Sequence, residues 1–192
     1  MVASKKDIRT QLKKSIYNLS KEEYSKKSAE ACAQLYEYLL SKSYKNIVIF
    51  YSLSDEINST YFIKKYFNEF SFYLPKIDSI DDKMTIHPLL DLESGLQKGK
   101  FSTQEPTEKS CEHWEEIVDC IVVPAIGIDY EGNRLGRGKG YYDKLLSGLK
   151  KNLIKIGFIF HLQLFEEIET EKHDIPVDIC ITEKGTFQMR RK

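Results

Sequence analysis

Residues 122–143 have the sequence VVPAIGIDYEGNRLGRGKGYYD. An apolar run ends at Pro124, a turn-rich connection follows, and three glycines then alternate with Arg137 and Lys139. Glycine permits positive φ and lets the backbone come close to a ligand, and successive backbone N–H groups in such a loop can bind an anion. Between Gly132 and Tyr142 there are three cations and no anion. This stretch therefore predicts a loop that binds phosphate.

The position of the loop supports the same prediction. It lies between the strand-like run Ile121–Ile128 and a helix-like segment that begins at Tyr141, and open α/β sheets bind ligands in such connections. The alternative is an exposed loop with ordinary surface cations. The spacing excludes the two common nucleotide motifs, because Gly140 follows Lys139 where GxxxxGK[ST] needs a hydroxyl, and the alternating glycines do not form GxGxxG.

The composition is that of an ordinary globular protein. The chain has 192 residues, of which 41% are hydrophobic and 30% charged, enough for one domain (1–192) with a sizeable core. Lys and Arg together number 29, as do Asp and Glu, so no overall field favours a nucleic acid or a membrane surface. We expect small-molecule substrates, no nucleic-acid or membrane partner, and a monomer.

The N-terminus and the cysteines bear on the cellular compartment. Residues 1–6 lead into a charged amphipathic segment without the apolar core of a signal peptide, and no apolar run is long enough to span a bilayer. The four cysteines contain no CxxC pair, and Cys32, Cys120 and Cys180 lie in apolar contexts typical of core thiols. These features argue against metal or disulfide roles, and we expect a reducing, cytoplasmic setting.

Strand-like and helix-like segments alternate along the chain. Apolar spacing predicts helices over 5–19, from a Ser20 capping box to about 41, from Asn58 or Ser59 to about 70, and over 141–149. Compact apolar runs predict strands at 46–51, 71–74, 83–87, 152–160 and 179–182. Residues 89–115 are irregular, 162–168 form a short helix or turn, and 184–192 form a frayed or surface-wrapped tail. This alternation predicts an α/β domain with a mainly parallel central sheet.

Two further groups of polar residues are candidates for the site. Lys5 and Arg9 are four residues apart and share one helix face, so they could bind one anion together; the alternative is a solvated basic helix. Tyr51, Asp55 and Glu56 follow a predicted parallel strand, at the edge where α/β proteins bind ligands. From position alone, Glu56 could equally be a surface carboxylate.

Other candidates are carboxylates for a metal and aromatic rings for a pocket wall. A nucleotide is bound with Mg²⁺, which needs oxygen ligands, and Asp143 directly after the glycine loop could supply one. Asp178 is a possible second ligand, whereas Asp143 could instead stabilise the start of a helix. Phe101 and Trp114 could line a pocket for a flat heterocycle or anchor their long loop to the core.

The stretch from Gly132 to Asp143 resembles the signature of the 5-formyltetrahydrofolate cyclo-ligase family. Other landmarks of this family follow in the expected order along most of the chain. They are Lys5-x-x-x-Arg9, Asp55-Glu56-Ile57, Val123-Pro124-Ala125 and Val177-Asp178. The weakest match is the irregular region 89–115.

The resemblance implies an ATP- and Mg²⁺-dependent cyclisation of 5-formyltetrahydrofolate to 5,10-methenyltetrahydrofolate, with release of ADP and phosphate. It also implies a three-layer α/β/α domain. Phosphoryl transfer needs mainly positioning and charge stabilisation. This accounts for cations and backbone donors without a recognisable Ser-His-Asp or Cys-His set, and the four histidines have no evident role.

The resemblance also assigns roles to residues of this sequence. The catalytic residues would be Arg137, Lys139 and Tyr141. The folate would contact Tyr51 and Glu56, with Glu56 accepting hydrogen bonds from the pterin, and it would meet ATP at Arg137, Gly138, Lys139, Gly140 and Tyr141. Asp143 and Asp178 would contribute to Mg²⁺ binding. The ATP-binding residues would be Lys5, Lys6, Arg9, Arg134, Leu135, Gly136, Arg137, Gly138, Lys139, Gly140, Tyr141 and Tyr142, of which Tyr142 could simply pack.

Two other classes of function remain as alternatives. A sugar-phosphate isomerase or an acyl or CoA transferase would use the phosphate loop without hydrolysing ATP, with Glu56 as base or nucleophile. A nucleic-acid-binding module would use the cations of residues 5–14 together with the glycine loop. The zero net charge and the absence of a basic patch interleaved with aromatic residues argue against the second alternative.

Overall fold

The computed structural model of the protein describes residues 4–78, 81, 83–99, 104–149, 153–171 and 174–190. Phe101, a predicted lining residue, lies outside the described residues. The helices are α1 (Lys5–Tyr17), α2 (Lys21–Ser41), α3 (Ser59–Lys65), α4 (Trp114–Ile117) and α5 (Tyr141–Ser147), with a 3₁₀ turn at His161–Gln163. The strands are β1 (Asn46–Ile49), β2 (Ser71–Ile77), β3 (Met84–Leu89), β4 (Leu96–Lys98), β5 (Gln104–Pro106), β6 (Cys120–Val123), β7 (Gly127–Asp129), β8 (Arg134–Leu135), β9 (Ile154–Phe158), β10 (Leu164–Phe165), β11 (Ile179–Thr182) and β12 (Gly185–Gln188).

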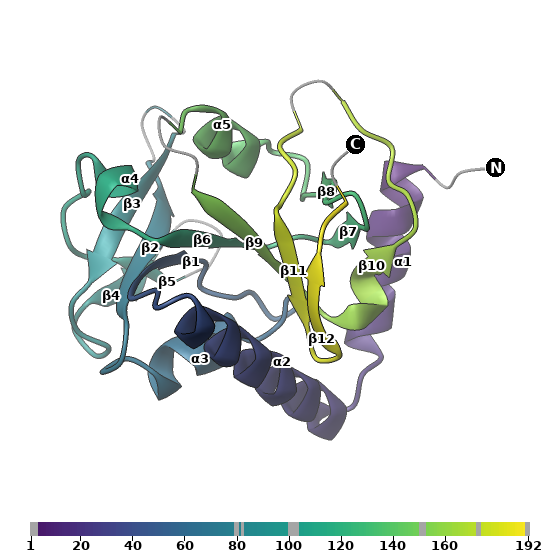
Figure 1. The fold of residues 1–192 in the computed structure, drawn as a ribbon, viewed down its shortest axis with the longest axis horizontal. Coiled ribbons are helices and arrows are strands. Elements are labelled where there is room, and N and C mark those ends of the chain that lie inside the picture. The colour runs from purple at the N-terminus through teal and green to yellow at the C-terminus, as the bar shows by residue number, and fades with distance from the viewer. Residues whose placement is uncertain are drawn as a thin grey trace.

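A mainly parallel sheet forms the centre of the fold (Figure 1). Among the described residues its strand order is β12-β11-β9-β6-β1-β2-β3, with parallel pairing from β11 to β2 and antiparallel pairing of β12 and β3 at the edges. The inner strands are largely apolar and buried, and in β6 every residue of Cys120–Val123 is buried. Parallel strands covered on both faces have this pattern. The predicted α/β class with a mainly parallel sheet is confirmed.

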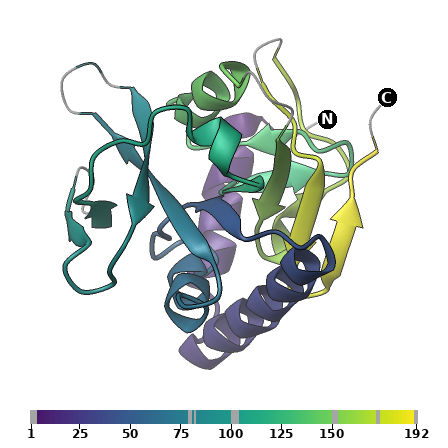
Figure 2. The ribbon, with the colours of Figure 1, turned by 60° about the vertical axis from the view of Figure 1, so that its left-hand side comes forward.

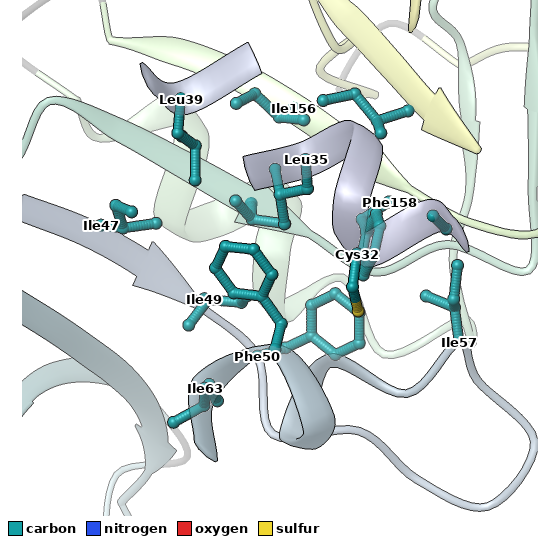
Figure 3. Close-up of a cluster of buried hydrophobic side chains, with 14 of the residues drawn as sticks. Cys32, Leu35, Leu39, Ile47, Ile49, Phe50, Ile57, Ile63, Ile156 and Phe158 are labelled. Carbon is teal, nitrogen blue, oxygen red and sulfur yellow. The ribbon is translucent and has the colours of Figure 1, made fainter. Parts of the chain in front are cut away.

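Helices cover both faces of the sheet, as Figures 1 and 2 show. Alternate residues of one strand face opposite layers, because successive side chains point to opposite sides. In β1, Ile47 and Ile49 pack with Leu35 and Leu39 of α2 in the larger core cluster (Figure 3). Val48, between them in sequence, belongs to the cluster that contains residues of α5. The implied three-layer arrangement is therefore present.

A smaller sheet extends the fold beyond β6. The chain forms β7 and β8 as an antiparallel hairpin, and β10 pairs with β7 in parallel. Helix α1 packs on this hairpin through Ile8 and Leu12, which form a separate apolar cluster with Leu135 and Ile168. The first helix of the chain thereby lies beside the stretch that begins the glycine loop.

The predicted helix starts are confirmed in the second and third helices. Ser20 and Glu23 form the predicted capping box of α2, and the side chain of Asn58 accepts a hydrogen bond from Tyr61 N–H at the start of α3. Helix α3 ends at Lys65, earlier than the expected position near 70. Tyr66 and Phe70 turn inward to join the aromatic rings of the core, which ends the helix.

Three other expectations need correction. The prediction of a frayed or surface-wrapped tail at 184–192 is wrong for 185–188, which form strand β12, antiparallel to β11. Gly185, at φ 136°, allows the tight turn between the two strands. The irregular region 89–115 contains the β4–β5 hairpin and the short helix α4, and residues 164–165 form β10. In the described ranges, no helix combines the length and the hydropathy that crossing a membrane requires.

Candidate active site

A cavity of about 820 Å³ opens at the carboxyl ends of β1 and β6. Phe50 and Tyr51 follow β1, and Pro124 and Ala125 follow β6, and all four line the cavity. The site therefore lies at the sheet edge where open α/β folds bind their ligands. The glycine loop forms one wall with Gly136, Arg137, Gly138, Lys139 and Gly140.

The β7–β8 hairpin explains why the glycine loop begins about ten residues after its strand. Its turn is built on the buried carboxylate of Asp129, which accepts hydrogen bonds from the N–H groups of Glu131 and Asn133 and from Ile168. Gly132 occupies the turn at φ 90°, where an added Cβ would lie 2.3 Å from the carbonyl oxygen of Val177. The hairpin is thus a rigid base from which the glycine loop departs.

Helix α1 fixes the near end of the loop. The guanidinium of Arg9 donates from Nε to the carbonyl oxygen of Gly136 at 2.9 Å. Gly138 follows with φ 91° and Gly140 with φ 66°, a conformation that other residues adopt only at a cost of about 1–2 kcal/mol. Lys5 and Arg9, which were predicted to share one helix face, both line the cavity.

Arg137 connects the glycine loop to the segment after β1. It donates two hydrogen bonds to Asp55, at 2.6 and 3.1 Å, and two to Oε1 of Glu56, at 2.9 and 3.1 Å. Burial acts to raise the pKa of Asp55, but the hydrogen bonds and charge of Arg137 hold that pKa below its ordinary value. The loop is therefore held to this segment by charge-assisted hydrogen bonds.

Burial and Arg137 also act in opposite directions on the pKa of Glu56, but with a different outcome from Asp55. Its other carboxylate oxygen accepts the N–H of Leu53 at 2.9 Å, and its carbonyl oxygen accepts the hydroxyl of Tyr24 at 2.7 Å. Only 12% of the side chain is exposed. Burial raises the pKa of Glu56 above its ordinary value even though Arg137 acts to lower it. Glu56 is thus held in a fixed position at the cavity wall. An additional hydrogen-bond donor would stabilise its ionised form.

Lys5 of α1 is paired with two carboxylates that also line the cavity. Its ammonium lies 2.9 Å from Glu171 and 3.2 Å from Asp174, both of which line the cavity. Burial acts to lower the pKa of Lys5, but the two carboxylates raise it above its ordinary value. Glu171 and Asp174 had no place in the sequence-based site. Glu171 ends the acidic stretch 166–171 and Asp174 follows it, but only the fold brings these residues to α1.

Arg134 is the buried cation of the site. Its Nη2 donates to Oδ1 of Asp143 at 2.6 Å, and its guanidinium lies 5.7 Å from the ring centre of Tyr142. The side chain is 3% exposed, and its Nε has no hydrogen-bond partner among the described residues. The ring of Tyr142 is partly buried in the core, while Tyr142, Arg134 and Asp143 all line the cavity.

A second part of the cavity wall is largely apolar. It includes Leu53 and, from the β2–β3 hairpin, Pro75, Ile77 and Met84. Tyr51 and Tyr141 add aromatic rings. The cavity therefore has a cationic side formed by α1 and the glycine loop, and an apolar side that suits a flat ring system.

Two predicted site residues lie away from the cavity. Lys6 is exposed on α1 and does not line it, because neighbouring helix positions face different directions. Asp178 precedes β11, at the amino end of that strand, and the cavity lies at the carboxyl ends. Its carboxylate accepts the N–H of Lys155 at 2.7 Å and pairs with the Lys155 ammonium at 2.9 Å. The structure thus places Asp178 in a buried pair between β9 and β11, instead of beside Asp143.

The carboxylates of the cavity suit a metal ion that is bound mainly by substrate phosphates. In the described part of the chain, no group of three or more His, Cys, Asp or Glu side chains could hold a metal ion. Asp143 lines the cavity with 18% of its side chain exposed. Mg²⁺ bound through one protein carboxylate and substrate phosphates has this kind of environment.

Comparison with known proteins gives one consistent result. Residues 1–183 match the 5-formyltetrahydrofolate cyclo-ligase family. A mouse 5-formyltetrahydrofolate cyclo-ligase is 29% identical over 193 residues, covering 94% of each chain. A Haemophilus influenzae protein of the same name is 26% identical over 186 residues, covering 92% of this chain and 97% of the relative.

Solved structures show the same fold. The NMR structure of Aquifex aeolicus 5,10-methenyltetrahydrofolate synthetase superposes with a TM-score of 0.84 at 31% identity, covering 98% of this chain and 94% of that one. A 5,10-methenyltetrahydrofolate synthetase from Mycoplasma pneumoniae superposes with a TM-score of 0.75 at 23% identity, covering 94% and 99%.

Proposed function

The chain belongs to the 5-formyltetrahydrofolate cyclo-ligase family, and from this premise we propose its reaction. It converts 5-formyltetrahydrofolate and ATP to 5,10-methenyltetrahydrofolate, ADP and phosphate, with Mg²⁺. The observation that carries the proposal is that the cations of the glycine loop and α1 line the same cavity as Tyr51 and Glu56. A triphosphate and a flat heterocycle can meet in such a cavity.

The chemical problem is the low reactivity of the formyl group. The N5-formyl group is an amide, and its oxygen is a poor leaving group. Transfer of the γ-phosphoryl group to that oxygen releases ADP and leaves an iminium-like carbon that carries phosphate. N10 then attacks this carbon and loses its proton, while the C–O bond breaks and phosphate leaves with the electron pair. The methenyl bridge joins N5 and N10.

The glycine loop and α1 would position the phosphates. Lys5, Arg9 and Lys139 supply charge at the cavity wall, and the backbone N–H groups of the loop can donate to phosphate oxygens. Phosphoryl transfer spreads negative charge over the equatorial oxygens, so Arg137 and Lys139 would act at the transferring group. Arg134, fixed by Asp143, would hold the triphosphate from the buried side.

Binding of the phosphates would require an exchange of partners. Arg137 is paired with Asp55 and Glu56, and Lys5 with Glu171 and Asp174. When a phosphate replaces these carboxylates, Glu56 would become available to accept hydrogen bonds from the pterin amino and ring N–H groups. Tyr51 would line the same pocket, and Tyr141 would contact the formyl group or the pterin where the two substrates meet.

Mg²⁺ would be held by the phosphates together with Asp143, whose Oδ1 is occupied by Arg134 and the N–H of Ile175. When bound, the metal neutralises phosphate charge. An isomerase or transferase would instead need Glu56 as a base or nucleophile. Its fixed hydrogen bonds to Leu53 and Arg137 favour an acceptor role over those roles.

The test is turnover of 5-formyltetrahydrofolate by the full chain, followed by the absorbance of the methenyl product and by ADP release. Product should form only with ATP and Mg²⁺ present together. Lys139→Ala should lose at least about 100-fold in turnover, in the range that loss of one transition-state donor causes, with the fold retained because the side chain is exposed. Lys64→Ala, an exposed lysine on α3, is the matched control. Folded protein without product formation would contradict the proposal.

A further inference from the structure

Gln163 is a buried polar residue to which the proposed reaction gives no part. It ends the 3₁₀ turn His161–Gln163, directly before β10, and is only 2% exposed. Its side-chain nitrogen Nε2 donates to the carbonyl oxygens of Ala125 at 3.1 Å and Ile126 at 2.9 Å. Its Oε1 accepts the N–H of Phe160 at 2.9 Å. The amide thus uses both of its donors and its acceptor, which fixes its orientation.

The two carbonyl groups belong to the segment that leads from β6 toward the glycine loop. Ala125 and Ile126 both line the active-site cavity, whereas Gln163 is not among the described residues that line it. Their carbonyl oxygens are therefore directed toward a buried amide behind the cavity wall. Because a carbonyl oxygen is the negative end of a peptide dipole, this arrangement keeps two such oxygens away from the place where phosphates would bind.

The hydrogen bonding continues from Ile126 to the first glycine of the loop. The N–H of Ile126 donates to the carbonyl oxygen of Leu135 at 2.8 Å. Leu135 ends β8 and immediately precedes Gly136, whose carbonyl oxygen accepts the guanidinium of Arg9. Both backbone polar groups of Ile126 are thus bonded, one to Gln163 and one to β8. A displacement of the amide would therefore move the point from which the glycine loop departs.

We infer that Gln163 is a positioning residue for the glycine loop. It acts on the phosphates only through Ile126 and Leu135. The inference rests on the proposed function, because it takes the loop to bind the phosphates of ATP. It assigns a part in that site to a residue outside the loop, α1 and the segment after β1.

The segment around Gln163 is itself fixed against β7. The N–H of Gln163 donates to the carbonyl oxygen of Phe160 at 2.9 Å, and β10 pairs with β7 (Figure 1). Gly127 permits this close packing, because an added Cβ would lie 3.0 Å from the ring of Phe165 and 3.4 Å from the carbonyl oxygen of Gln163. The small residue of β7 and the amide together determine the path of the connection after β6.

Glycine amide signals test the positioning without any ligand. The full-length protein labelled with ¹⁵N-glycine gives at most ten backbone signals, which single Gly→Ala variants assign. Gln163→Met keeps the approximate length of the side chain and removes its hydrogen bonds. It should shift the signals of Gly136 and Gly138 and leave that of Gly185, at the turn between β11 and β12, in place. Unchanged signals of Gly136 and Gly138 in the folded variant would overturn the inference.

ATP binding tests the consequence for the site. Calorimetric titration with ATP and Mg²⁺, without folate, should give a Kd about two- to tenfold higher for Gln163→Met, the range of one lost neutral hydrogen bond. Gln188→Met, which removes a side-chain amide bond to the carbonyl oxygen of Asp178, is the matched control and should leave this Kd unchanged. Equal ATP affinity of the parent and Gln163→Met would contradict the positioning role.

Turnover separates positioning from a purely structural role. In Gln163→Met, KM for ATP should rise and kcat should fall about tenfold or more, because small displacements of positioning groups are costly. KM for 5-formyltetrahydrofolate should change little. A residue that only stabilises the fold would reduce the amount of active protein and leave both KM values as they are in the parent, and that result would overturn the inference.

Gly127→Ala is a second variant, which keeps the side chain of Gln163. Its Cβ should displace the packed segment by a few tenths of an ångström, so it should shift the same two glycine signals and raise the Kd for ATP by a smaller factor. If Gln163→Met does not fold, unchanged signals and Kd in Gly127→Ala would overturn the inference. Failure of the parent protein to bind ATP would overturn the proposed function instead.

Discussion

Arg137 donates four hydrogen bonds to two carboxylates of the site. It holds two carboxylates whose pKa values are displaced in opposite directions, downward for Asp55 and upward for Glu56. The difference arises because Asp55 takes a bidentate pair, whereas burial dominates at Glu56. Both carboxylates accept hydrogen bonds from the same guanidinium.

Removal of Arg137 should therefore raise the pKa of both carboxyl groups. In the parent, the pairing of Asp55 stabilises the fold at pH values above its ordinary pKa of 3.8, and this contribution is lost as the pH falls through the lower folded value. Glu56 acts in the opposite sense, because ionisation against a raised pKa costs stability. Carboxyl ¹³C NMR titration of Arg137→Ala measures both values. If the pKa of Asp55 is the same in the variant as in the parent, Arg137 is not the cause of its lowering.

Gly138 tests the shape of the phosphate loop without changing its charge. At φ 91° an alanine is strained, although its Cβ would meet only the Arg9 guanidinium at 3.8 Å. Gly138→Ala should cost about 1–2 kcal/mol of stability and reduce kcat/KM for ATP by about tenfold or more, since small displacements of positioning groups are costly. Gly148→Ala, with φ −83° at the end of α5, is the control. Equal activity of the two variants would show that the loop shape is not needed.

At the scale of elements, helix α1 directs two neighbouring lysines, both predicted to bind ATP, to different surroundings. Lys5 and Arg9 face the cavity, and Lys6 faces solvent. Lys5→Ala should raise KM for ATP about tenfold, the loss of one hydrogen bond to a charged group, and Lys6→Ala should change KM little. Steady-state kinetics with varied ATP decides between them. A larger effect from Lys6→Ala would mean that α1 turns another face to the nucleotide.

The sequence predicted those parts of the site that depend on local pattern. The three glycines, the cations between them and the position of Glu56 after a parallel strand all follow from spacing, and the structure brings them into one cavity. Glu171 and Asp174 could not be predicted in the same way. Their contact with Lys5 joins residues 166 and 169 positions apart, and only the complete fold creates it.

The same reasoning explains which elements were predicted well. Capping signals are local, so the start of α2 at Ser20 was predicted correctly. The end of α3 and the strand β12 depend on tertiary contacts, because Tyr66 and Phe70 are drawn into the core and β12 needs β11 as its partner. A polar segment such as 185–188 shows little strand pattern until that partner is present.

At the scale of the whole molecule, Asp178 is an example of a residue whose role follows from the sheet. Its carboxylate pairs with Lys155 of β9, and its carbonyl oxygen accepts hydrogen bonds from Met189 N–H and the Gln188 side chain. It therefore links three neighbouring strands. This arrangement accounts for an aspartate just before the last parallel strand without any metal.

Asp178→Ala should accordingly act on stability. Removing one partner of a buried pair leaves the other charge uncompensated, at a cost of about 3 kcal/mol or more. Urea denaturation measures this loss, and the Mg²⁺ concentration for half-maximal turnover of the remaining folded enzyme should not change. Asp143→Asn should raise that concentration. A stable Asp178→Ala protein that needs a higher Mg²⁺ concentration for half-maximal turnover would indicate that Asp178 contributes to Mg²⁺ binding.

The central claim is that the cavity delivers a phosphoryl group to the formyl oxygen, and the path of that oxygen tests it most directly. The substrate is 5-formyltetrahydrofolate labelled with ¹⁸O in the formyl group, incubated with the protein, ATP and Mg²⁺ for a single turnover. The released phosphate is then analysed by mass spectrometry. The account predicts one ¹⁸O atom in each phosphate released, at the isotopic enrichment of the substrate. Methenyl product accompanied by unlabelled phosphate would contradict it.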